Sequence, residues 1–175
     1  MPGIEGFFDK ATSTASFLVW DPVTRDAAII DAVLDFDAAT GKLGTGSADA
    51  VLARADALGL KVIWALETHA HADHLSAANH IRKLTGARIG IGSRITEVQT
   101  QFRAMFGAPE AETEGAVFDR LFADGDTFRI GEVEARVMHT PGHTPACVTY
   151  VIEDAAFVGD TLFMPDYGTA RADFP

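Results

Sequence analysis

Apolar residues along the chain follow two spacings, and each spacing predicts a different kind of element. Short runs rich in β-branched and aromatic residues, bounded by Gly, Pro or Asp, are typical of strands. We expect strands at residues 14–20, 27–33, 61–66, 88–91, 127–130, 132–138, 148–152 and 156–159.

Apolar residues at helical spacing predict three helices between these strands. They are expected at residues 48–58, 73–84 and 95–106. Ser47 is the expected N-cap of the first helix, and Gly86 is expected to end the second. Because helices alternate with strand-rich stretches, we expect a layered α/β (α+β) fold rather than a β-sandwich or a helical bundle.

Composition narrows the class of protein. With 175 residues, 47% of them hydrophobic, the chain can bury one ordinary core, so a single domain over residues 1–175 is expected. A net charge of -11 argues against a nucleic-acid partner, which needs a clustered basic face. The sequence shows neither a signal-peptide pattern nor an apolar run near the ~20 residues of a membrane span. We therefore expect a cytoplasmic protein without a membrane partner.

Three of the six histidines fall within six residues, in His69-Ala70-His71-Ala72-Asp73-His74. In an extended segment, side chains two residues apart point to the same side, so His69 and His71 can converge. Asp73 and His74 then turn the chain into the expected helix. Imidazole and carboxylate donors together suit zinc, iron or manganese, and the donor types do not decide among these metals.

Two further donors follow expected strands. Pro141 and Gly142 form a tight turn that can present His143, and Asp160 follows an apolar strand, where an unpaired charge is costly without a cation. Each feature alone is commonly structural, because Gly-Asp and Pro-Gly pairs are usually turns and Asp73 could cap a helix. Occurring together and in this order, they predict a metal site.

The order His-x-His-x-Asp-His, Thr-Pro-Gly-His-Thr and strand-Gly-Asp resembles the metallo-β-lactamase superfamily, from about Thr14 to the end of the chain. That resemblance implies an αββα sandwich with the metal at the edge of its two sheets. Since the chain ends after a loop at 164–170 and without a terminal helix, we expect only the N-terminal part of this sandwich, truncated at its C-terminal end.

Three segments, at residues 67–75, 143–150 and 171–174, resemble the persulfide dioxygenases, including their bacterial β-lactamase-like-hydrolase branch. That resemblance implies one Fe(II) per chain held by His71, His143 and Asp160. Two histidines and one carboxylate match the facial triad of non-haem iron oxygenases. The implied reaction converts glutathione persulfide, O2 and water to sulfite and glutathione, so the expected partners are a small-molecule thiol persulfide and O2.

The resemblance also assigns roles around the iron. His69, Asp73 and His74 are expected to orient ligands and to hold a water or the substrate. Three more residues are expected beside the substrate or the ligands: Cys147, Arg171 and Asp173. For Cys147 a simple role as a small buried residue on a strand is also open.

A glyoxalase II-like thioesterase is the main alternative, with two zinc ions activating a bridging hydroxide. One zinc would then be bound by His69, His71 and His143, the other by Asp73 and His74, and Asp160 would bridge them. Proteins of that kind usually carry a His four residues after the Pro-Gly-His turn, where this chain has Cys147. A lactonase or other metallo-hydrolase, a non-catalytic metal sensor, a homo-oligomer and a rhodanese-like partner domain are left open.

Overall fold

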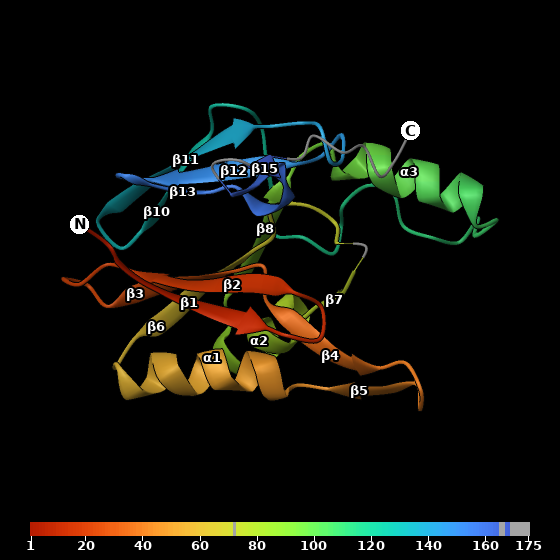
Figure 1. Ribbon diagram of the computed structural model, residues 1–175. Coiled ribbons are helices and arrows are strands. Elements are labelled where there is room, and N and C mark those ends of the chain that lie inside the picture. Colours follow the sequence, from red (N-terminus) through yellow and green to blue (C-terminus); the bar gives the residue numbers. More distant parts are fainter. Residues whose placement is uncertain (72, 165–166, 169–175) are drawn as a thin grey trace.

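Two β-sheets pack face to face, and two helices cover the outer side of one of them (Figure 1). This arrangement is seen in a computed structural model, which describes residues 1–71, 73–164 and 167–168. Arg171 and Asp173, expected beside the substrate, lie outside the described residues. The layers of sheet and helix confirm the α/β character expected from the sequence.

The larger sheet has six strands in the order β1-β2-β3-β6-β8-β9. Strand β2 runs antiparallel to its neighbours β1 and β3, whereas β3, β6, β8 and β9 are parallel neighbours. The bounds are β1 Gly3–Asp9, β2 Thr14–Trp20, β3 Asp26–Ile30, β6 Lys61–Leu66, β8 Arg88–Gly92 and β9 Arg120–Phe122.

The second sheet is an antiparallel meander whose strands follow one another in sequence. Its strands are β10 Thr127–Ile130, β11 Val133–His139, β12 Val148–Ile152 and β13 Ala155–Phe157. Shorter elements complete the described chain: β4 Val33–Asp37, β5 Lys42–Gly44, β7 Leu75–Ser76, the 3-10 turn η1 Gly159–Thr161, β14 Leu162–Met164 and β15 Tyr167–Gly168.

The core between the sheets is rich in aromatic residues. Trp64 of the larger sheet meets Phe128 of the second edge to face, with ring centroids 5.4 Å apart, and Phe122 and Tyr150 complete the cluster. The alternating burial of β10 and β11 places one face of each strand in this core. Each large apolar side chain buried here contributes ~1.5–3 kcal/mol to stability, which fixes the two sheets against each other.

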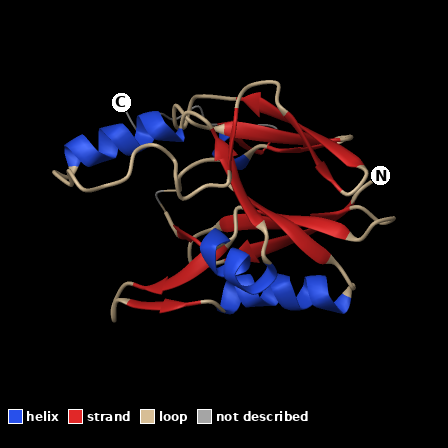
Figure 2. Ribbon diagram, turned by 180° about the vertical axis from the view of Figure 1, so that it is seen from behind, coloured by secondary structure: helices blue, strands red, loops and turns tan. Residues whose placement is uncertain are grey.

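The helices α1 Gly46–Ala57 and α2 Ala78–Thr85 pack on the outer face of the larger sheet (Figure 2). They bury small and β-branched residues there, among them Val51 and Ile81. The helix α3 Ile95–Met105 packs separately, against the end of β8. None of the helices in the described part of the chain is long and apolar enough to cross a membrane.

Several predicted boundaries need correction. The second helix begins at Ala78 rather than at residue 73, because Leu75 and Ser76 pair with β4 as a short strand. Leu84, expected in its apolar stripe, is 62% exposed. The N-cap position of the first helix is Thr45 rather than Ser47, and the side chain of Thr45 makes no capping hydrogen bond. Seven described strands were not predicted: β1, β4, β5, β7, β9, β14 and β15.

Candidate metal centre

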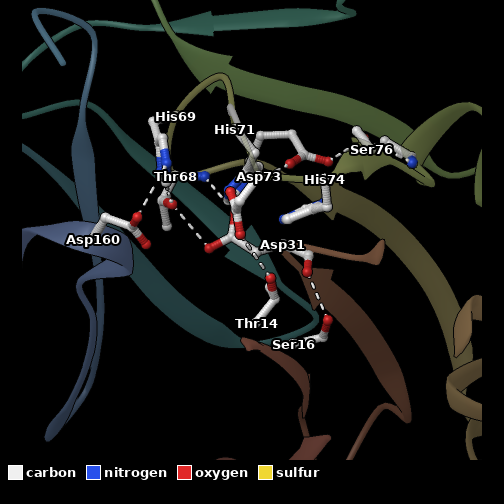
Figure 3. A network of polar contacts seen from close by, with 12 residues as sticks. Thr14, Ser16, Asp31, Thr68, His69, His71, Asp73, His74, Ser76 and Asp160 are labelled. Carbon is white, nitrogen blue, oxygen red and sulfur yellow. Dashed lines mark hydrogen bonds and ion pairs between the residues drawn. The ribbon is translucent and has the colours of Figure 1, made fainter. Parts of the chain in front are cut away.

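The predicted donors gather where the two sheets meet, at one edge of the sandwich. The parallel strands β3 and β6 end at Ile30 and Leu66, so the segments that follow them leave the larger sheet at the same edge. His143 arrives from the turn before β12, and Asp160 lies in η1 after β13. Figure 3 shows His69 and Asp160 approaching each other from these two sides.

His69, His143 and Asp160 form one group whose ligand atoms all lie within 4.8 Å of one another. The Oδ2 atom of Asp160 is 3.5 Å from His143 Nε2 and 3.9 Å from His69 Nε2. The Nε2 atom of His69 is buried and makes no hydrogen bond. A buried nitrogen that makes no hydrogen bond and faces a carboxylate fits a cation site, and two imidazoles with one carboxylate suit a divalent metal.

The structure does not place His71 in that group, although the sequence predicted it there. His71 Nε2 lies 3.1 Å from Asp31 Oδ1 and 3.2 Å from Glu67 Oε2. The rings of His69 and His71 are neighbours, as alternation predicted, with centroids 4.0 Å apart. Two buried carboxylates hold the Nε2 of His71, so His69 takes the position expected for His71 beside His143.

Asp73 and His74 lie on the more open side of the site. With His71 they form a second group of ligand atoms within 4.8 Å of one another. Asp73 Oδ2 accepts a hydrogen bond from Thr14 Oγ1 at 3.2 Å. His74 Nδ1 donates to the carbonyl of Leu75 at 3.0 Å, and its ring lies 4.1 Å from that of His71.

The charges of the buried groups follow from their neighbours. Burial alone would raise the pKa of Asp31, but the charge and hydrogen bond of His71 hold that pKa below its usual range. Burial works against a charged His71, yet Asp31 and Glu67 raise its pKa well above its usual value. Burial, with the charge of His71, lowers the pKa of His69 to about 3. His69 is therefore neutral at pH 7 and its nitrogen can bind a metal.

Burial also raises the pKa of Asp160, against the opposing charge of His143. Cys147 is 2% exposed, and burial raises the pKa of its thiol. Its sulfur accepts the backbone N–H of Thr144 at 3.2 Å. In this position Cys147 closes the turn that carries His143, so its observed contacts are those of a buried structural residue.

Three residues at the site were missed by the sequence reasoning: Asp31, Glu67 and Thr68. A signal for the two carboxylates was present, because Asp31 follows the apolar β3 and Glu67 follows the apolar β6. Asp160 was predicted from the same signal, a carboxylate that follows an apolar strand. For Thr68 the sequence offered no comparable signal, since a hydroxyl next to a histidine is unremarkable.

A cavity of about 470 Å³ opens beside the metal group. The turn between β1 and β2, at residues 12–15, forms one wall, and residues 156–160 with Leu162 and Phe163 form another. Asp31, His71 and Asp73 also line it. A small ligand in this cavity would lie within reach of Asp160 of the first group and of His71 and Asp73 of the second.

Several known proteins are similar to this chain over nearly its whole length. A probable metallo-hydrolase of Burkholderia pseudomallei is 53% identical over 98% of this chain and 62% of its own length. Glyoxylase B2 of Dictyostelium discoideum is 43% identical over 98% of this chain and 60% of its own length. The mitochondrial persulfide dioxygenase ETHE1 of Homo sapiens is 32% identical over 95% of this chain and 54% of its own length. The chain thus spans 54% to 62% of the lengths of these relatives.

A solved structure, ETHE1 from Myxococcus xanthus, matches with a TM-score of 0.74 and 25% identity, covering 97% of this chain and 64% of that one. This match confirms the metallo-β-lactamase-type fold expected from the motif order. The family model described as the metallo-beta-lactamase superfamily matches residues 9–174. The chain therefore belongs to the metallo-β-lactamase superfamily.

Proposed function

We propose that this chain carries the metal centre of a persulfide dioxygenase, which oxidises glutathione persulfide with O2 to sulfite and glutathione. The observation that carries the proposal is the group of His69, His143 and Asp160 with its unsatisfied buried nitrogen. We assign one Fe(II) per chain to this group. The 32% identity to the human persulfide dioxygenase supports the reaction.

The protein's own residues supply position and charge. His69, His143 and Asp160 would hold the ion through two imidazoles and one carboxylate, a donor set that would leave room for the two reactants. When bound, the iron supplies electrons to O2 and holds both reactants close together. Phe17, Phe157 and Phe163 line the cavity and would shield one side of a bound substrate from water. Asp73, 3.2 Å from Thr14 Oγ1, can hold a water or the substrate on the other.

A dinuclear zinc thioesterase is the second candidate, and one observation favours it. His71, Asp73 and His74 form a second group that could hold a second metal. The 43% identity to glyoxylase B2 also supports a glyoxalase II-like hydrolase. Against it, Cys147 replaces the histidine that such proteins usually carry, and its sulfur bonds within its own turn. Both candidates share the first metal position.

Metal content and oxygen uptake test the proposal on the full-length protein, purified without oxygen. We expect close to one iron per chain and O2 consumption with glutathione persulfide that stops after iron removal. Hydrolysis of S-lactoylglutathione by protein with two zinc ions per chain, without O2 uptake on the persulfide, would replace the dioxygenase by the thioesterase.

A further inference from the structure

Asp31 is a buried acidic residue that the proposed reaction does not use. It follows β3, is 4% exposed, and has a φ of 52°, in the left-handed region that Asp tolerates better than most residues. Its N–H donates to the carbonyl of Leu66 at 2.9 Å, and its own carbonyl accepts from Ser16 Oγ at 2.6 Å. These bonds fix the Asp31 carboxylate relative to the end of β6.

That carboxylate binds Thr68 through both oxygens (Figure 3). Oδ1 accepts the backbone N–H of Thr68 at 2.7 Å, and Oδ2 accepts its hydroxyl at 2.8 Å. The carbonyl of Thr68 in turn accepts the N–H of Val148 at 2.9 Å. A Cβ atom at Gly159 would lie 2.3 Å from Thr68 Oγ1, so the chain before Asp160 packs directly on this hydroxyl. Thr68 is therefore fixed from four directions.

The hydroxyl of Thr68 has one proton, and it donates that proton to Asp31. The same oxygen lies 3.0 Å from His69 Nδ1. Toward His69 it can only accept, because an ionised carboxylate has no proton to return. Nδ1 of His69 must then carry the ring hydrogen, and the lone pair is left on Nε2, which faces Asp160 Oδ2 at 3.9 Å.

We propose that Asp31 and Thr68 form a hydrogen-bond relay that fixes the tautomer of His69, so that Nε2 is always presented to the metal as a lone pair. Both are positioning residues, since neither contacts the metal group of His143 and Asp160 in the role assigned here. The inference rests on the proposed role of His69 as a ligand. Outer residues that fix the tautomer and orientation of a ligand histidine typically contribute ~10–100-fold in metal affinity.

Asp31→Asn tests the direction of the relay. Its amide oxygen must stay at the Oδ1 position, because the opposite orientation would set an NH2 group against the N–H of Thr68. The NH2 group then faces Thr68 Oγ1 and donates to it, so the hydroxyl turns and donates to His69 Nδ1. We expect the hydrogen to move to Nε2 and the affinity for Zn²⁺ to fall ~10–100-fold.

Thr68→Val and Thr68→Ser test the hydroxyl itself. Valine has nearly the shape of threonine but no donor, so we expect a mixture of His69 tautomers and about tenfold weaker Zn²⁺ binding. Serine keeps the hydroxyl and should keep both properties. Ser16→Ala is the matched control, because it removes a buried hydroxyl bond to the carbonyl of Asp31 and leaves the carboxylate untouched.

Two measurements on the full-length protein read the outcome. Long-range ¹H–¹⁵N correlation spectra of metal-free, ¹⁵N-histidine-labelled protein at neutral pH report the His69 tautomer, and competition with a chromophoric chelator reports Zn²⁺ affinity. The relay is supported if Asp31→Asn reverses the tautomer, Thr68→Val mixes it, and Thr68→Ser and Ser16→Ala do neither. An Nδ1–H tautomer that persists in both Asp31→Asn and Thr68→Val would overturn it.

The same data separate this inference from the proposed function. If wild-type protein shows the expected tautomer but binds no metal, the relay stands and the metal centre fails. If it binds metal with the same affinity in Thr68→Val, the metal centre stands and the relay fails. If Thr68→Ser loses as much affinity as Thr68→Val, packing rather than the hydroxyl is responsible, which also overturns the relay.

Discussion

The floor of the site, formed by Asp31, Thr68 and His69, differs sharply from its rim, formed by Asp73 and His74. The floor residues are 4%, 1% and 1% exposed, and their side chains are bonded to one another. At the rim, Asp73 is exposed, and its hydrogen bond to Thr14 is long and open to solvent. The floor is therefore prepared before any ligand arrives, whereas the rim can adapt to one.

Preorganisation affects binding because groups already in position lose little freedom when they bind. The proposed first metal position would use His69 of the floor, and a second would use Asp73 and His74 of the rim. We therefore predict that a metal at the first position is held more tightly than one at the second, although Nε2 of His74, like that of His69, is buried without a hydrogen bond. Substitutions at the floor and at the rim should therefore have effects of different size.

The largest effect is expected from removing a direct ligand. In the full-length protein, His69→Ala and Asp160→Ala should each lower metal affinity by more than the ~10–100-fold typical of an outer residue. Asp73→Ala should keep most of the metal. Metal content per chain after dialysis measures the difference. If His71→Ala empties the site while His69→Ala does not, the ligand set predicted from the sequence is correct and the one assigned from the geometry is wrong.

Asp31→Ala should lower the free energy of unfolding of the metal-free protein by ~3 kcal/mol. It leaves the buried N–H of Thr68 without its acceptor and removes one of the two carboxylates beside the imidazole of His71. Urea unfolding at pH 7 measures the loss. Asp73→Ala, at the exposed rim, is the control and should change stability by no more than about 0.5 kcal/mol. Equal losses in the two variants would contradict the contrast between floor and rim.

Stability of the metal-free protein should also fall on mild acidification. Folding lowers the pKa of His69 from 6.5 to about 3. The folded protein therefore favours the neutral ring, and this contribution to the free energy of unfolding is fully present above pH 6.5 and is lost as the pH falls from 6.5 toward 3. Between pH 7 and pH 5 the loss from this residue is about 2 kcal/mol. His71 offsets part of this loss, because folding raises its pKa. The contribution of His71 to stability is complete below its pKa in the unfolded chain and is lost as the pH rises through its pKa in the folded protein.

Urea unfolding of wild type and His69→Asn at several pH values isolates the contribution of His69 to the pH dependence of stability. The wild type should lose more stability than the variant between pH 7 and pH 5. Parallel pH profiles would mean that His69 titrates normally in the folded protein.

The smallest effect is expected at the rim. Thr14→Val removes the hydroxyl that donates to Asp73, and an exposed hydrogen bond contributes no more than about 1 kcal/mol. Zn²⁺ affinity and the unfolding midpoint should both stay close to wild type. A loss of metal as large as that of Asp31→Asn would show that the rim is as important as the floor.

The sequence predicted the regular parts of the fold because local patterns decide them. Strand β2 was predicted at its observed bounds, and β6 likewise, since β-branched and aromatic runs are distinctive. The second helix was placed too early because residues after Asp73 look helical in isolation. Strands β7 and β4 pair although they lie far apart in the sequence, and no local pattern encodes this pairing.

The candidate site was predicted in composition but not in detail. His143 and Asp160 come together as expected, yet spacing alone could not tell which imidazole of the His-x-His pair would join them. That choice depends on Asp31 and Glu67, which reach His71 from β3 and β6 and hold its Nε2. Such long-range contacts of buried charges appear only once the strands are placed side by side.

The proposed ligands come from distant parts of the chain, so a bound metal would also hold the fold together. His69 follows the larger sheet, whereas His143 and Asp160 flank strands of the second sheet. An ion bound to all three would cross-link the sheets and close two long loops, so it would restrict the unfolded chain much as a disulfide does. Removing it with a chelator should loosen the attachment between the sheets and speed amide hydrogen exchange first in β12 and β13, well before the helices on the far face unfold.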